Sequence, residues 1–136
     1  MSLRTFASAL IFAAALPALG ACAQMDQEPA PADIPPGNVT GEAVSCIDLS
    51  RIRSTQVHGD ETIDFDVGGG KVYRNILPNR CYSLGFEERF AYETSTGQLC
   101  STDTITVLHS DGARGTTCGL GQFLPIELTD QQATGQ

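Results

Sequence analysis

The sequence has no tryptophan, only two histidines and half as many basic as acidic side chains. The lack of tryptophan disfavours a site that stacks carbohydrate rings. Eight Lys and Arg against sixteen Asp and Glu leave a formal net charge of −8. Because an acidic surface repels nucleic acid and anionic lipid, we expect no nucleic-acid partner, whereas this charge allows a cationic one.

Motifs of the common enzyme classes are also missing. The chain has no nucleophile elbow, no zinc-protease helix motif and no dinucleotide fingerprint. The three glycines at residues 68–70 do not predict a phosphate loop, because a β-branched and aromatic stretch follows them instead of a helix start with Lys-Ser/Thr. We therefore predict no enzymatic activity, no cofactor and no bound metal.

The apolar run over residues 6–16 is too short to cross a membrane as a helix, which needs about 20 residues. The run follows the single positive side chain Arg4, and Pro17 ends it before the small residues Gly20 and Ala21. Charged, apolar and small-residue segments in this order are typical of a secretory signal. We expect residues 1–21 to be a signal peptide.

Leu19-Gly20-Ala21-Cys22 resembles the bacterial lipobox. The resemblance implies that Cys22 becomes the acylated N-terminal residue and that the lipid bilayer is its partner. Ala23, which is not aspartate, implies the outer membrane, facing the periplasm. The alternative is an ordinary signal cleaved nearby, with Cys22 as a free thiol. Setting Cys22 apart leaves an even four cysteines, which favours lipidation.

Residues 23–42 contain four prolines and almost no large apolar side chain. Such a composition cannot bury enough surface to offset the entropy of ordering, so we expect an extended, mostly disordered spacer that follows Cys22. The folded domain is then expected over residues 43–129, with a frayed tail at 130–136.

Alternating apolar residues and turn residues predict an all-β domain. If residues 68–70 form a hairpin loop, Phe65 lies opposite Tyr73 and Asp64 opposite Arg74, with the aromatic pair inside and the charged pair outside. The whole domain shows about six short strands and no convincing amphipathic helix. We expect a small disulfide-stapled antiparallel meander or barrel.

Cys46, Cys81, Cys100 and Cys118 are expected to form two disulfides, because a small exported domain needs covalent staples. Gaps of tens of residues are unlike the short ligand spacing of a zinc site. A hairpin folded around Asp111 does not bring Cys100 opposite Cys118. Of the pairings left, we expect Cys81–Cys100 with Cys46–Cys118.

Several segments, together with the four cysteines, resemble a family of small exported proteins of alphaproteobacteria, sphingomonads especially. The segments are residues 62–65, 72–77 and 118–121, with Leu99, Cys100, Asp103 and Ile105. The resemblance covers nearly all of the expected domain. It implies the location and the class of protein, but it carries no activity or mechanism.

Basic and aromatic side chains stand out in this acidic chain and define a candidate binding face. They are Arg51, Arg53, Tyr73, Arg74 and Arg80. The alternative is that these side chains pair with neighbouring acids. We expect a non-enzymatic envelope lipoprotein that binds an envelope protein or a ligand, or that has a structural role. The sequence makes no prediction about its oligomeric state.

Two other functions remain open. Residues 68–73 resemble the glycine-and-tyrosine loop of small lipid-anchored β-barrel inhibitors of cationic wall-degrading enzymes such as lysozyme. A small hydrolase would instead need Glu87, Glu93, His58 and His109 to converge in one pocket.

Overall fold

The computed structural model describes residues 33–129, which form ten strands and two short helical turns. The elements are β1 (Gly37–Val39), β2 (Cys46–Asp48), the 3-10 turn η1 (Leu49–Arg51), β3 (Ser54–His58), β4 (Thr62–Gly68), β5 (Lys71–Ile76), α1 (Leu84–Glu87), β6 (Phe90–Tyr92), β7 (Gln98–Cys100), β8 (Thr104–Leu108), β9 (Arg114–Gly119) and β10 (Phe123–Leu128). The all-β prediction is confirmed, with more strands than the six expected.

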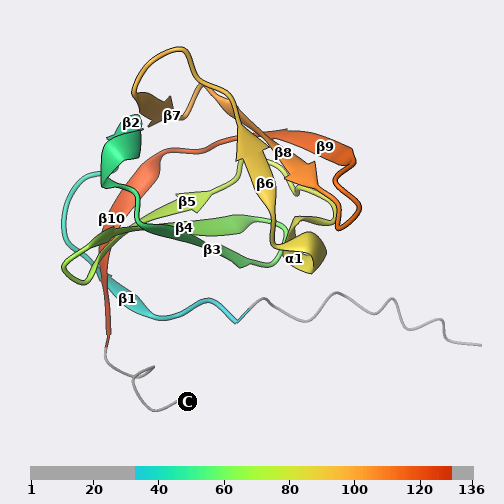
Figure 1. The fold of residues 1–136 in the computed structure, drawn as a ribbon. Coiled ribbons are helices and arrows are strands. Elements are labelled where there is room, and N and C mark those ends of the chain that lie inside the picture. Colours follow the sequence, from blue (N-terminus) through green and yellow to red (C-terminus); the bar gives the residue numbers. More distant parts are fainter. Residues whose placement is uncertain (1–32, 130–136) are drawn as a thin grey trace, which may run out of the picture.

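The strands form three antiparallel sheets (Figure 1). The largest has the order β1-β10-β5-β4-β3, a second has the order β6-β8-β9, and β2 pairs with β7 alone. The β6–β8–β9 sheet lies across one end of the five-stranded sheet, and the β2–β7 pair lies near the other end. The strands over residues 33–129 therefore form an open arrangement of sheets and no closed barrel.

The β4–β5 hairpin has the register that the sequence predicts. Phe65 pairs with Tyr73 and Asp64 with Arg74. Gly69 and Gly70 form the loop with φ of +66° and +76°, a backbone region that glycine enters without steric strain. A register shift after Asp66 completes the turn.

The core lies between the sheets and is centred on Phe65, which is fully buried on β4. Its ring packs edge-to-face against Phe90 of β6 and Phe123 of β10, with centroids 6.3 and 5.5 Å apart. Aromatic rings prefer this geometry. One side chain thus joins the five-stranded sheet to β6.

The two disulfides are Cys46–Cys100 and Cys81–Cys118. The predicted pairing, Cys46–Cys118 with Cys81–Cys100, is therefore wrong. All four cysteines are nevertheless bonded, and the disfavoured pair Cys100–Cys118 does not form. β2 pairs with β7 so that Cys46 lies directly opposite Cys100, 54 residues away. No local pattern indicates a strand pairing between segments so distant.

The segment before residue 43 belongs to the fold. β1 pairs with β10, and the Thr40 N–H donates to the Pro125 carbonyl at 3.0 Å. The predicted spacer, residues 23–42, therefore ended too late in the chain. Its composition did not indicate a strand, because main-chain pairing with a sheet edge requires no apolar side chains. Residues 1–32 and 130–136 lie outside the described range, so the signal, the acylated Cys22 and the frayed tail stay predictions. Within residues 33–129, no helix is long and apolar enough to cross a membrane.

Candidate binding surface

The five residues of the predicted binding face do not share one surface. Arg51 ends η1 and Arg53 immediately precedes β3, so these two lie close along the chain. Tyr73 and Arg74 are neighbours on β5 and therefore point to opposite faces of the sheet. Arg80 lies in the connection between β5 and α1.

Arg80 is held by an acidic neighbour, as the alternative interpretation expects. Its Nε and Nη2 atoms each lie 3.0 Å from Asp60 Oδ2. The other oxygen of Asp60 accepts from the Gly85 N–H at 2.9 Å. The guanidinium also lies 5.6 Å from the Tyr82 ring centroid. Asp60 therefore ties the connection before β6 to the β3–β4 turn.

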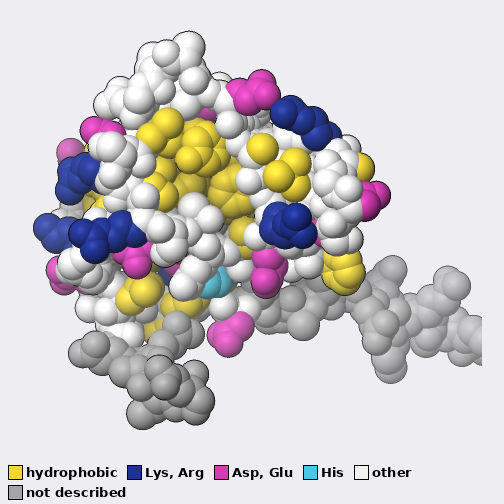
Figure 2. Space-filling view, in the orientation of Figure 1, with side chains coloured by type: hydrophobic (Ala, Val, Ile, Leu, Met, Phe, Trp, Pro, Cys, Tyr) yellow, Lys and Arg dark blue, Asp and Glu magenta, His cyan; other side chains and the backbone are white. Residues whose placement is uncertain are grey.

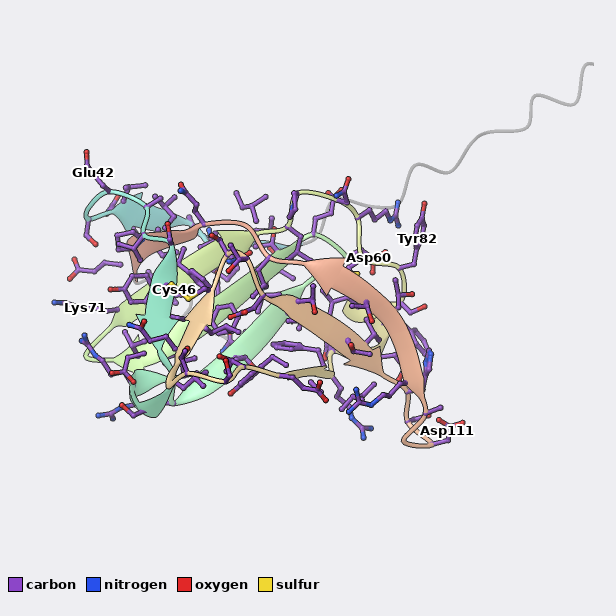
Figure 3. All side chains as sticks on the ribbon, turned by 90° about the horizontal axis from the view of Figure 1, so that it is seen from above. Glu42, Cys46, Asp60, Lys71, Tyr82 and Asp111 are labelled. Atoms are coloured by element: carbon purple, nitrogen blue, oxygen red, sulfur yellow. A yellow bond between two sulfur atoms is a disulfide. The ribbon has the colours of Figure 1, made fainter. Side chains whose placement is uncertain are left out.

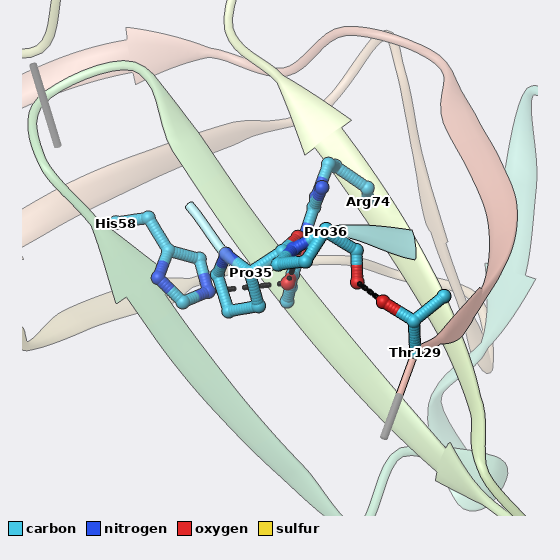
Figure 4. A network of polar contacts seen from close by, with 6 residues as sticks. Pro35, Pro36, His58, Arg74 and Thr129 are labelled. Atoms are coloured by element: carbon cyan, nitrogen blue, oxygen red, sulfur yellow. Dashed lines mark hydrogen bonds and ion pairs between the residues drawn. The ribbon is translucent and has the colours of Figure 1, made fainter. Parts of the chain in front are cut away.

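Arg74 is held more tightly, on the outer face of the five-stranded sheet (Figure 4). Its Nε and Nη2 donate to the two oxygens of Asp64 at 2.8 and 2.7 Å, and Nη2 also donates to the Pro35 carbonyl at 2.9 Å. His58 Nε2 lies 3.1 Å from Asp64 Oδ2. Asp64 is only 4% exposed. The charged pair expected on the outside is thus buried, and it fixes the segment that leads into β1.

Four basic side chains form no ion pair with any residue in the range 33–129: Arg51, Arg53, Lys71 and Arg89. Arg53 crosses the hairpin at Gly68, where a β-carbon would lie 2.8 Å from the guanidinium carbon. Gly68 pairs with Lys71, so these two cations meet at the same turn. Lys71 lies at the opposite end of the domain from Asp111 (Figure 3). We call Arg51, Arg53 and Lys71 the basic end, whereas Arg89 lies in the link between α1 and β6.

Asp48 lies near one member of the basic end. The Ser50 hydroxyl and N–H both donate to its Oδ1, at 2.7 and 2.9 Å. These hydrogen bonds lower the pKa of Asp48 below its ordinary value, and the charge of Arg51 contributes in the same direction. Arg51 is therefore partly balanced by Asp48. Lys71 lies opposite Glu127 in the β5–β10 register, and Asp66 accepts from the Gly68 N–H beside Arg53, although neither carboxylate forms an ion pair with these cations.

Five apolar side chains are only partly buried. They are Leu49, Ile52, Val57, Tyr73 and Phe90, all packed against the buried core. Figure 2 shows apolar atoms in a hollow between the η1 end of the domain and β6, next to Lys and Arg side chains. We call it the apolar hollow.

β3 borders both features and is the last strand of the five-stranded sheet. Its first three residues are exposed, and its register with β4 runs without a shift from Ser54 to His58. Among the strands described, β4 is its one partner, so its free edge presents N–H and C=O groups that no strand satisfies. The strand begins next to Arg53, and its inward side chain Val57 packs against the buried core.

The four residues that a hydrolase would need do not converge. His109 Nδ1 lies 2.8 Å from Glu87 Oε1 near α1, whereas His58 contacts Asp64 on the outer face of the large sheet. Glu93 forms an exposed ion pair with Arg114 at 3.2 Å. In the described part of the chain, no three His, Cys, Asp or Glu side chains group in a way that would hold a metal ion.

Comparison with known proteins gives no relative from which a function could be transferred. No family model matches the chain, no curated protein matches it, and no solved structure matches it. The resemblance to exported four-cysteine proteins therefore stays a prediction from the sequence.

Sequence reasoning missed Lys71, the apolar hollow and the β3 edge. Lys71 carries a usable signal, because a charged residue directly after three glycines lies at the tip of a hairpin. The uncharged stretch that follows Arg53 is a second signal. The five partly buried apolar side chains have no shared local signal, since they come from four separate elements and the residue after η1.

Proposed function

We propose that this chain is an exported, lipid-anchored envelope protein that acts by binding a partner, and that the partner contacts the β3 edge, the apolar hollow and the basic end. One observation carries the proposal. Arg53 and Lys71 form no ion pair within residues 33–129, although the chain has a net charge of −8. Unpaired cations beside partly exposed apolar side chains are typical of a surface that another molecule covers.

The anchor in this proposal depends on the sequence. Leu19 to Cys22 resembles a lipobox behind a signal-like run. The two disulfides support export, because disulfides persist in oxidising compartments and are rare in the cytosol.

The charge at the hairpin argues against an inhibitor of a cationic enzyme. The glycine loop that resembles such inhibitors lies between Arg53 and Lys71. A cationic enzyme would meet like charges there, and like-charge contacts across an interface weaken binding. The same geometry favours an anionic partner.

Mass spectrometry and site-specific photo-cross-linking test the two parts of the proposal. The protein from native membranes is expected to carry a diacylglyceryl mass on Cys22 and to lack four thiol protons. A photo-reactive residue at Thr55 in the full chain is expected to give a discrete cross-linked product, which Arg53→Glu removes. Thr116, exposed on β9, is the matched control position. Identical products from both positions would contradict the binding surface, and an unmodified Cys22 would contradict the anchor.

A further inference from the structure

We propose that the partner is an extended acidic segment of another protein, which adds as a further strand to the free edge of β3. This inference deepens the binding function proposed above and rests on it. In strand addition, main-chain hydrogen bonds supply affinity, and the pockets that receive alternate side chains supply specificity.

The edge of β3 lacks the usual protection against pairing. Natural edge strands are kept from pairing by charges, proline, bulges, short length or a covering element. β3 reads Ser-Thr-Gln-Val-His, contains neither a proline nor an acidic or basic residue other than histidine, and has no register shift against β4. The other edge strands of the two larger sheets have protections that β3 lacks.

The other edge strands carry these protections. β1 has three residues and follows two prolines. β6 also has three residues. β9 begins at Arg114, contains two glycines and has a register shift against β8. Among the described strands of the two larger sheets, β3 is therefore the edge best suited to accept a strand.

The neighbourhood of β3 limits where an added strand can lie. Gly85, in α1, packs so closely on Gly59 that a β-carbon there would lie 2.7 Å from the Gly59 Cα. α1 therefore blocks extension beyond His58. The opposite end of β3 begins at Arg53, beside Lys71. An added strand would span the five residues of β3 and end at the basic end.

The cations of the basic end indicate the chemical class of the added strand. An added strand that ends near Arg53 and Lys71 is stabilised by carboxylates, because both cations lack an ion pair in the described chain. A second copy of this protein is a poorer occupant. Its own β3, Ser54–His58, has no acidic residue to offer within the paired strand.

The apolar hollow decides the pattern of the occupant. Side chains of a strand point alternately to the two faces of its sheet. On an added strand, every second side chain would therefore point to the inner face, the face on which Val57 and Tyr73 pack against the core. The expected segment has alternating apolar residues, with acidic residues at the end that meets Arg53.

Synthetic peptides bound to the purified, oxidised full chain test the inference. The probe is a fluorescent nine-residue peptide, Glu-Glu-Val-Thr-Val-Thr-Val-Glu-Glu. One control replaces every Glu by Lys, and a second keeps the acidic sequence but carries N-methyl groups on alternate backbone amides. We expect the acidic peptide to bind at least about tenfold more tightly than either control, and to slow hydrogen exchange over residues 53–58.

Charge reversals in the protein complete the test. Arg53→Glu is expected to weaken binding of the acidic peptide about tenfold, whereas Arg114→Glu, the same change on β9, is expected to alter it less than about twofold. Equal binding of the lysine peptide would overturn the acidic assignment, and equal binding of the N-methylated peptide would overturn strand addition. Dimerisation of the chain that the acidic peptide abolishes would identify a second copy as the occupant and overturn the external partner.

The outcomes also separate this inference from the proposed function. If the peptides fail while the Thr55 cross-link persists, the surface binds a partner by another geometry. If the Thr55 cross-link also fails, the binding function itself is wrong.

Discussion

The side-chain amide of Asn75 clamps the backbone of Gly121, donating to its carbonyl oxygen at 2.7 Å and accepting from its N–H at 2.8 Å. Asn75 lies on β5 and is fully buried, and Gly121 lies in the link from β9 to β10. One side chain thus satisfies both backbone polar groups of a distant residue. The clamp sets where β10 begins, and β10 in turn carries β1.

Asn75→Ala should remove both hydrogen bonds and leave the backbone groups of Gly121 without their partner. We expect the free energy of unfolding to fall by about 2–4 kcal/mol, because unsatisfied buried polar groups are costly. Urea unfolding measures the loss. Asn79→Ala, at an exposed turn, is the matched control and should change stability by less than about 0.5 kcal/mol. Equal losses in the two variants would show that the clamp contributes nothing.

Gly121→Ala should be destabilising for a different reason. A β-carbon at Gly121 would collide with the carbonyl oxygen of Ile76, whereas a β-carbon at Gly119 would meet no atom within 4 Å. We expect Gly121→Ala to lower stability by at least about 2 kcal/mol through this overlap. Thermal unfolding of the two alanine variants compares them directly. A Gly121→Ala variant as stable as Gly119→Ala would contradict the close approach of the two backbones.

Arg74→Ala should release the segment before β1. The change leaves Asp64 as a buried carboxylate without its bidentate partner and removes the hydrogen bond to Pro35. We expect a loss of about 2–4 kcal/mol, together with faster hydrogen exchange over residues 35–40. Arg80→Ala breaks the more exposed Arg80–Asp60 pair and should lower stability by no more than about 1 kcal/mol. Unchanged exchange in Arg74→Ala would show that β1 is held by its pairing with β10 alone.

Peptide mapping without reduction should find Cys46 linked to Cys100 and Cys81 linked to Cys118. Replacing Cys81 and Cys118 together by alanine should lower stability by about 3–4 kcal/mol, because the bond closes a loop with a sequence separation of 37 residues. The Cys46 and Cys100 double variant, with a separation of 54, should show a loss of similar size. A linked peptide that joins Cys81 to Cys100 would contradict the strand pairing of β2 with β7.

The predicted hairpin register, which depended on neighbouring residues, was confirmed, whereas the predicted disulfide pairing, which depended on distant strands, was wrong. The register of Phe65 with Tyr73 follows from the glycine loop between them, so the sequence contains it. The burial of Asp64 does not follow, because its partner Arg74 also donates to the carbonyl of Pro35, far away in the chain. The same reason explains the wrong disulfide pairing.

The residues of the candidate surface also divide into those that the sequence indicates and those that only the fold can assign. The sequence singles out Arg51, Arg53 and Tyr73 as unusual in an acidic chain, and these residues remain part of the proposed surface. It cannot separate them from Arg74 and Arg80, because only the fold shows which arginine meets a carboxylate. Pairing with Asp64 and Asp60 therefore removes two of the five residues.

By itself, the sequence determined the all-β class, the β4–β5 register and the oxidation of the four cysteines, because alternation, turn residues and cysteine spacing act locally or through composition. The prediction of export and acylation at Cys22 has the same origin. The tertiary structure alone decided which cysteines meet, that residues 37–39 form a strand, and that Arg53, at the start of the β3 edge, lies at the same hairpin as Lys71. Each of these depends on backbone pairing between segments tens of residues apart, and no local pattern encodes the partner of a strand.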